Sequence, residues 1–212
     1  ASAAIRRYLD LGNGLDATAL RAIGTKYICL LNLTELNRID PSSLKLVSLN
    51  VSACSEPTKD ILYAKAKRAF SGLPFPAYYE LIEPYLGIAP AVDLRALSMK
   101  NVNMNINTFV NLRRDSLMSL TPSEVQGLLG VNLPDLRKWQ NKPPIWQWVR
   151  RQKQSELDEL RIGLTGGTQE GYINLAIPVS QLSSSASLGP VVMTLHLLPA
   201  LLSTFLLMSI LS

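Results

Sequence analysis

The charged residues of this chain stop well before its end, and this asymmetry constrains the fold more than any other feature. The chain has 21 Lys and Arg residues and 16 Asp and Glu residues, and all of them lie in residues 1–170. Residues 171–212 contain none. The whole chain is 47% hydrophobic, which supplies enough apolar material for a core and excludes a fully disordered protein. We therefore expect a charged, folded body over residues 1–178 and an uncharged end.

The uncharged end has three parts. Residues 183–187 are small, residues 188–190 form a short spacer, and residues 191–211 are almost entirely apolar. As an α-helix this last part would span roughly 31 Å, about the thickness of a bilayer core. No charged residue follows it, whereas a transmembrane helix normally has Lys or Arg on its cytoplasmic side. Small residues, a spacer and an apolar tail are typical of a signal for attachment of a glycosylphosphatidylinositol (GPI) anchor.

The short spacer favours Ser183 as the attachment residue, with Ser184 and Ser185 as alternatives. We expect residues 179–190 to form a flexible linker that carries this site, and residues 191–212 to be removed on maturation. Two other interpretations remain, an uncleaved single-pass membrane anchor and a buried core helix. Pro199 would be unusual in a core helix, because proline removes a backbone donor and clashes with the preceding turn.

The charged body has the pattern of short helices separated by turns. Thr121 and Glu124 form a capping-box pattern with Pro122 at the first helical position. Further helix starts are expected at Asp16, Thr34 and Asp40, and further helices over residues 59–70, 78–86, 93–97 and 145–160, the last being the longest. Only residues 171–177 have the pattern of an extended segment.

Each of these helices is too short to be stable alone and must bury its apolar face on its neighbours. Helix stops are predicted at Gly24, Gly87, Asn101 and Gly130. Their spacing is irregular, so the sequence contains no clean repeat. An array of short helices is nevertheless typical of an α-solenoid. The expected fold class is therefore all-α, with stacked short helices, a linker and a hydrophobic C-terminal signal.

Cys29 and Cys54 are the only cysteines of the chain. A GPI signal implies passage through the oxidising secretory pathway, which favours a disulfide between them. Such a bridge would stabilise the fold by roughly 3 kcal/mol in the chain-entropy model. The alternative is two buried free thiols.

Two sequons for N-glycosylation begin at Asn32 and Asn50. Asn50 lies in a polar connection and is the stronger candidate. The residues of the first sequon also suit helix capping, and Thr34 is a candidate cap there. In a secretory protein we expect at least one of the two asparagines to be glycosylated.

Catalytic residue types are scarce. The single histidine, His196, lies in the tail that we expect to be removed, so the mature body would have no His-based catalytic or metal site. We therefore predict no enzymatic activity, no metal and no cofactor. The net charge is +5, but the basic residues are dispersed among acids without a nucleic-acid-binding motif, so no nucleic acid is expected as a partner.

Three tryptophans, Trp139, Trp146 and Trp148, lie within ten residues around two consecutive prolines. Such a cluster is typical of a binding hot spot. It is also typical of a core anchor beside a rigid turn, which is the interpretation we favour.

The body also resembles a known family in the order and spacing of its motifs. The residues that carry the resemblance are LGIAP at 86–90, DLRALS at 93–98, LLG at 128–130, WVRRQ at 148–152, LDEL at 157–160 and the glycines near 163–171, together with Cys29 and Cys54 upstream. Over residues 15–185 this pattern is similar to the C-terminal part of the mesothelin family, which includes otoancorin and stereocilin.

The resemblance implies a right-handed superhelix of armadillo- or HEAT-like helices on the outer cell surface. It also implies that Cys29 pairs with Cys54, that Ser183 is the attachment site, and that the protein acts in cell adhesion without catalysis. The implied partner is a cell-surface mucin or another glycoprotein. Mucin recognition in the family is attributed to a more N-terminal part, so no residue of this chain is identified as mucin-binding. The alternative function is structural attachment of cells to extracellular matrix, as in the otoancorin branch.

Overall fold

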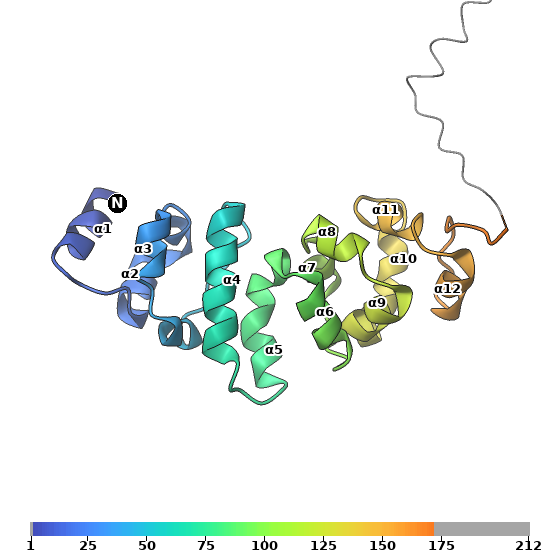
Figure 1. The fold of residues 1–212 in the computed structure, drawn as a ribbon, viewed down its shortest axis with the longest axis horizontal. Helices are drawn as coiled ribbons and strands as arrows, with labels where there is room; N and C mark the ends of the chain where they lie inside the picture. Colours follow the sequence, from blue (N-terminus) through green and yellow to red (C-terminus); the bar gives the residue numbers. More distant parts are fainter. Residues whose placement is uncertain (1, 172–212) are drawn as a thin grey trace, which may run out of the picture. The chain divides into compact units, whose positions relative to one another are not determined.

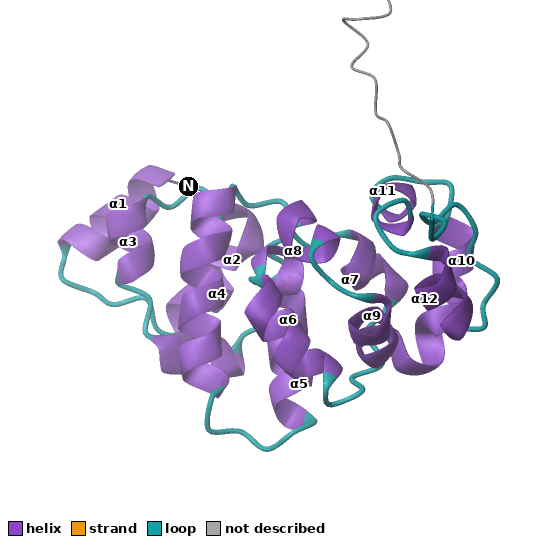
Figure 2. Ribbon diagram, turned by 45° about the vertical axis from the view of Figure 1, so that its right-hand side comes forward, coloured by secondary structure: helices purple, strands orange, loops and turns teal. Residues whose placement is uncertain are grey.

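The computed structural model describes residues 2–171, and these residues fold into short helices (Figures 1 and 2). No strand is present in this range, where backbone pairing outside helices and turns is limited to two isolated bridges. The prediction of an all-α body is therefore confirmed. The predicted extended segment from residue 172 onward, the linker and the apolar tail lie outside the described residues.

The structure has twelve α-helices and three 3-10 helices between residues 2 and 159. The α-helices are α1 (Ser2–Asp10), α2 (Ala17–Ile28), α3 (Leu33–Asn37), α4 (Glu56–Phe70), α5 (Ala77–Ile82), α6 (Ala91–Ser98), α7 (Ile106–Val110), α8 (Arg114–Met118), α9 (Pro122–Leu129), α10 (Leu136–Trp139), α11 (Ile145–Val149) and α12 (Gln154–Glu159). The 3-10 helices are η1 (Pro41–Leu46), η2 (Glu83–Ile88) and η3 (Gly130–Asp135).

Helices that are close in the sequence pack against one another, and Figure 1 shows them following in chain order from α1 to α12. The long helix α4 contacts α3 and η1 before it and α5 and η2 after it. Further along, α6 packs against α8 and α9. A continuous apolar core runs through the whole array, because each helix buries its apolar stripe on the helices before and after it.

Polar contacts between layers have one characteristic span. Every side-chain hydrogen bond that joins described residues more than twenty positions apart spans 24 to 30 positions, from Arg38 with the carbonyl of Leu9 to Trp148 with the carbonyl of Leu120. No such bond reaches two layers away. This is the contact pattern of a solenoid, in which each layer touches only its neighbours.

The same kind of ion pair recurs at three interfaces between neighbouring layers. The third residue of a helix is acidic, and it forms an ion pair with a cation 26 to 29 positions earlier in the chain. The three pairs are Glu35 with Arg6 at 3.7 Å, Asp93 with Lys67 at 2.7 Å and Glu124 with Arg95 at 3.0 Å. The acid thus lies near the helix N-terminus, where the backbone amides favour negative charge, and also fastens the helix to the previous layer.

Most predicted helix starts are confirmed, and one is wrong. Asp16 caps α2, Asp40 caps η1, and Thr121 forms the predicted capping box of α9. The helix at residues 33–37 begins two residues earlier than predicted and is capped by Asn32 instead of Thr34, because the Asn32 side chain accepts a hydrogen bond from the backbone amide of Glu35.

The predicted single helix over residues 145–160 is also wrong. The chain forms α11, leaves the helical conformation at residues 150–153, and restarts as α12. The break is caused by pairing with a later segment, since Thr168 donates to the Gln152 carbonyl at 2.8 Å and accepts from the Gln154 amide at 2.9 Å. The longest helix of the described chain is therefore α4, with 15 residues.

The predicted helix stops have different outcomes. Gly130 ends α9 with a positive φ of 50°, and Asn101 follows α6 with a positive φ of 49°. Gly24 instead lies inside α2, where its φ of 72° and ψ of 160° produce a kink. Gly87 lies within η2, because the predicted helix over residues 78–86 forms as α5 and then tightens into a 3-10 helix.

Candidate functional site

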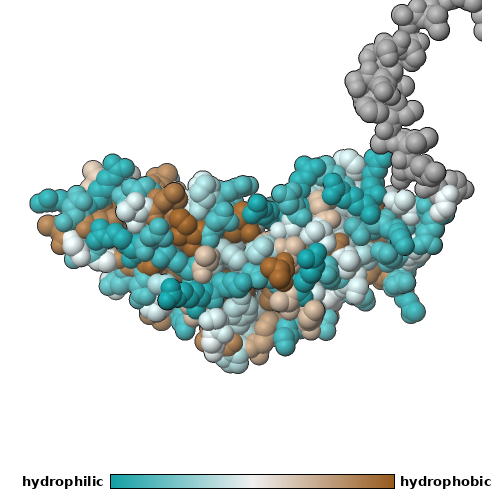
Figure 3. Space-filling model, in the orientation of Figure 1, coloured by the Kyte–Doolittle hydropathy of each residue, from teal (hydrophilic) through white to brown (hydrophobic). Residues whose placement is uncertain are grey.

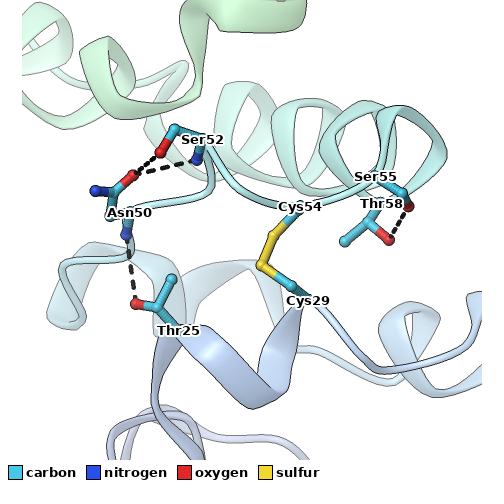
Figure 4. Close-up of a disulfide and its surroundings, with 7 residues drawn as sticks. All are labelled: Thr25, Cys29, Asn50, Ser52, Cys54, Ser55 and Thr58. Atoms are coloured by element: carbon cyan, nitrogen blue, oxygen red, sulfur yellow. Dashed lines mark hydrogen bonds between the residues drawn. A yellow bond between two sulfur atoms is a disulfide. The ribbon is translucent and has the colours of Figure 1, made fainter.

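A disulfide joins Cys29 to Cys54, as predicted (Figure 4). Cys29 ends α2, and its backbone amide donates to the carbonyl of Thr25 at 3.2 Å. Cys54 lies buried in the segment that leads into α4. Their Cα atoms are 4.7 Å apart, within the range that a disulfide requires. The bridge spans 25 positions, so it is a covalent link between neighbouring layers.

The second sequon lies beside this bridge. The Asn50 side-chain oxygen accepts hydrogen bonds from the amide and the hydroxyl of Ser52, at 3.1 and 2.6 Å. The Asn50 backbone amide in turn points at the hydroxyl of Thr25, 3.4 Å away. Figure 4 shows the side-chain oxygen facing Ser52 and the side-chain nitrogen on the opposite side. Asn50 is exposed, and this Asx turn presents its amide nitrogen away from the backbone.

The first sequon has a structural role in the fold. The Asn32 side-chain oxygen accepts from the amide of Glu35 at 2.8 Å, and the Glu35 carboxylate accepts from the amide of Asn32 at 2.8 Å. Both Asn32 and Thr34 are exposed. Because the cap uses only the oxygen of Asn32, its side-chain nitrogen remains on the surface. Whether either asparagine carries a glycan stays a prediction.

The three tryptophans occupy different environments. Trp148 is fully buried, and its indole nitrogen donates to the carbonyl of Leu120 at 2.8 Å. Trp139 and Trp146 are half-buried, and each lies near a cation, Lys142 at 5.1 Å and Arg150 at 5.7 Å from the ring centres. Trp148 therefore anchors the core, while the other two side chains are partly exposed.

A polar cluster that the sequence did not reveal fastens α4 to α6. The hydroxyl of Tyr63 donates to Asp93 at 2.6 Å, and the Lys67 ammonium lies 2.7 and 2.8 Å from the two oxygens of the same carboxylate. Burial, together with the bond to Asp93, raises the pKa of the Tyr63 hydroxyl far above its usual value. Tyr63 and Lys67 are four positions apart and share a helix face, but nothing in the sequence assigned Asp93 as their partner.

A concave surface of about 500 Å³ lies between the segment that carries Asn50, α4, η2 and α7. Lys59, Glu83 and Asn107 supply polar groups to it, and Ile88 supplies apolar surface. Tyr85, which also lines this surface, is only 3% exposed, and its hydroxyl has no hydrogen-bond partner among the described residues. Burial raises the pKa of Tyr85 to about 12.

Apolar residues are also present on the outer surface. Figure 3 shows them gathered mainly over the N-terminal helices on the face drawn, with hydrophilic residues over much of the rest. An apolar groove of about 310 Å³ lies there between α1 and α2, lined by residues such as Ile5, Tyr8, Ile23 and Tyr27. No group of His, Cys, Asp and Glu in residues 2–171 has the arrangement of a metal site.

The predicted anchor site lies outside the described part of the chain. Ser183, Ser184 and Ser185 belong to it, as do His196 and the apolar tail at residues 191–211. Among residues 2–171, no helix has the length and apolar composition needed to cross a membrane.

These features define a class of protein, in which stacked short helices carry one disulfide between neighbouring layers. Comparison with known proteins identifies the family. The family model described as Mesothelin matches residues 1–207. Mouse mesothelin is 39% identical over 196 residues, which cover 90% of this chain and 31% of that protein.

Two further relatives agree with this match. Rat mesothelin is 40% identical over 86% of this chain and 30% of its own length, and a human mesothelin-like protein is 33% identical over 74% of this chain and 25% of its own length. The chain belongs to the mesothelin family. It spans about a third of the length of the mouse and rat relatives.

Proposed function

We propose that this chain is part of a GPI-anchored cell-surface glycoprotein that mediates cell adhesion by binding and not by catalysis. The observation that carries the proposal is the family match over residues 1–207, which includes both the helical body and most of the apolar tail. The disulfide supports it, because such bridges persist in secretory and extracellular compartments. In this proposal the stacked helices form a right-handed superhelix of armadillo- or HEAT-like layers.

The anchor is attached at Ser183 in this proposal, with Ser184 or Ser185 as alternatives. The transamidase accepts small residues at and after the attachment position, and residues 183–187 supply them. The peptide bond after the attachment serine breaks as the lipid amine bonds to its carbonyl, so residues 184–212 leave when Ser183 is used, and the mature chain is held on the outer face of the cell membrane by lipid alone.

The proposed partner is a cell-surface mucin or another glycoprotein. Because the chain spans about a third of its mouse and rat relatives, residues outside it are expected to contribute to recognition. The part described by the structure offers two surfaces for it, the apolar groove between α1 and α2 and the half-buried rings of Trp139 and Trp146. Aromatic side chains of this kind are frequent hot spots in protein interfaces.

Treatment of cells with phosphatidylinositol-specific phospholipase C tests the anchor. The chain is expressed behind a signal peptide, and we expect the enzyme to release it into the medium. The mass of the purified protein should lack every residue after the attachment serine, which is residues 184–212 for Ser183. The matched control is Leu201→Arg, which places a charge in the apolar tail and should abolish lipase-sensitive surface display.

Retention of residues 191–211 in surface protein would contradict the anchor and identify an uncleaved membrane-spanning segment instead. Binding of the released protein to glycoprotein-coated surfaces tests the adhesion role. Selective binding to extracellular matrix, with none to mucin-type glycoproteins, would replace that role by the structural attachment function.

A further inference from the structure

The concave surface beside Asn50 has the dimensions of a small-ligand site. Its volume of about 500 Å³ lies within the range of small-molecule pockets in proteins. It is bounded by four segments, namely the connection around Asn50, α4, η2 and α7. These segments belong to two successive layers of the solenoid, so anything that fills the space contacts both layers.

Asn50 lies at the edge of this surface in an orientation that suits glycosylation. Its side-chain oxygen is held by the amide and hydroxyl of Ser52, and its side-chain nitrogen donates to no residue that the structure describes. The hydroxyl of the sequon is therefore hydrogen-bonded to the asparagine that would be modified. Because Asn50 itself lines the concave surface, the first sugar on its nitrogen would begin within reach of the other lining residues.

The lining suits an amphipathic sugar. Ile88 provides apolar surface for a sugar ring, while Lys59, Glu83 and Asn107 provide donors and acceptors for hydroxyl and acetamido groups. Glu83 is held in place by the hydroxyl of Thr108, which donates to it at 3.1 Å. The side chain of Lys59 forms no ion pair with any described residue.

Tyr85 is a further lining residue of this surface. Its side chain is almost fully buried and lines the same surface, yet its hydroxyl has no partner among the described residues. A buried polar group without a hydrogen bond is costly, and native structures usually satisfy it with protein, water or ligand. The hydroxyl oxygen of Tyr85 is itself shielded from solvent, so a sugar seated on the concave surface would contact Tyr85 without bonding to its hydroxyl.

We propose that the first N-acetylglucosamine of an N-glycan on Asn50 is seated in this concave surface and bridges two layers of the solenoid. In the attachment step the Asn50 side-chain nitrogen loses a proton and bonds to C1 of the sugar, and the lipid diphosphate of the donor leaves. The inference rests on the passage through the secretory pathway that the proposed function includes. The glycan is then part of the fold, since it replaces solvent between α4, η2 and α7.

The test compares the two sequons in the full chain secreted from mammalian cells. Peptide N-glycosidase cleaves the bond between asparagine and the first sugar, so its rate reports the accessibility of that sugar. Under native conditions we expect release from Asn50 at least tenfold more slowly than from Asn32, whose sequon lies on an exposed helix cap. After denaturation the two rates should become equal.

Two variants distinguish a sugar held in the concave surface from a glycan that the glycosidase releases slowly for another reason. Asn107→Trp fills the concave surface while keeping the sequon, and it should accelerate release from Asn50 at least fivefold. Gln126→Trp, on an exposed position of α9 away from this surface, is the matched control and should leave the rate unchanged.

Loss of each glycan gives a second readout. Ser52→Ala removes the second sequon but keeps the Asn50 side chain, and it should lower the melting temperature by about 3 °C, as expected for the loss of a few hydrogen bonds in a domain of this size. Thr34→Ala removes the other sequon without removing the Asn32 cap and should change it little. An unglycosylated Asn50, or equal native release rates that Asn107→Trp does not alter, would overturn the inference. Release of the chain by the lipase is independent of Asn50 and still tests the proposed function.

Discussion

Trp148 is the largest fully buried side chain among the C-terminal helices. It is fully buried, and its indole nitrogen satisfies the carbonyl of Leu120 from the preceding layer. Trp148→Phe removes that donor and leaves a cavity, so the free energy of unfolding should fall by about 2–4 kcal/mol. Urea unfolding measures the loss.

Trp146→Phe is the control for this prediction, because Trp146 is half-buried and its ring lies near Arg150. Trp146→Phe should lower the free energy of unfolding by less than about 1 kcal/mol, the usual range for a partly exposed ring with one cation contact. Equal costs for the two substitutions would show that Trp148 is no more a core anchor than its neighbour.

Tyr85 links stability to alkaline pH. Burial raises its pKa from 10.0 to about 12 in the folded protein. A folded pKa above the unfolded one contributes stability that is complete below pH 10 and is lost as pH rises toward 12. Phenylalanine does not ionise, so Tyr85→Phe should make the unfolding free energy fall less steeply over this interval, by up to about 1.4 kcal/mol per pH unit.

Unfolding in denaturant at pH 9, 10 and 11 measures this slope for both proteins. Some pH dependence should remain in the variant, because burial also raises the pKa of Tyr63 and Tyr79. Identical slopes in the variant and the parent protein would contradict a buried, neutral Tyr85.

Among the elements, α2 and α4 are fastened covalently through the Cys29–Cys54 bridge. Replacing both cysteines by Ala should lower the free energy of unfolding by about 3 kcal/mol, because the unfolded chain regains the entropy of a closed loop of 25 positions. Parallel unfolding of the parent protein with and without reductant measures the same quantity. Reductant should leave the double variant unchanged, and a parent protein equally insensitive to reductant would contradict the prediction.

The contact between α6 and α9 depends on the absence of a side chain. A Cβ at Gly127 would overlap the backbone carbonyl of Ser98, which cannot move without moving the end of α6. Gly127→Ala should therefore destabilise the protein by about 2–3 kcal/mol, the cost of overpacking a rigid contact. Thermal unfolding measures this loss, and Gly72→Ala is the control. A Cβ at Gly72 meets nothing within 4 Å, so the free energy of unfolding should change by no more than about 0.5 kcal/mol.

Local chemistry predicted the element starts better than the element ends. Asp16, Asp40 and the Thr121 capping box are signals contained in a few consecutive residues, and the structure confirms them. The end of α11 depends on the pairing of residues 152–154 with Thr168, which no local pattern contains. The cap at Asn32 instead of Thr34 is also a local feature, because the side chains of Asn32 and Glu35 each accept a hydrogen bond from the other's backbone amide.

The features of the candidate site also differ in whether the sequence could predict them. Two cysteines, together with the GPI signal that the sequence predicts, were sufficient to predict the disulfide. The polar cluster of Tyr63, Lys67 and Asp93 and the concave surface around Tyr85 arise from the stacking of layers 24 to 30 positions apart. An irregular spacing of helices does not reveal that register, so these features could not be read from the sequence.

For the described part of the molecule as a whole, each layer contacts only its neighbours. Substitutions in distant layers should therefore affect the free energy of unfolding independently. Cys29 and Cys54 lie in layers that share no hydrogen bond with the layer of Trp148 among the described residues. We therefore expect the destabilisation from the two cysteine substitutions and from Trp148→Phe to add within about 0.5 kcal/mol. Combined variants measured by urea unfolding give the comparison, and a larger coupling energy would contradict nearest-neighbour packing.

The same one-layer packing determines how the described part of the chain would respond to a pulling force. Force along the chain would load the layer interfaces in series, and those held by hydrogen bonds and apolar contacts would separate one at a time. The disulfide is the exception, because it withholds 25 positions, or roughly 85 Å of extended chain, from any extension. Its redox state would thus determine how long a tether the protein becomes under load.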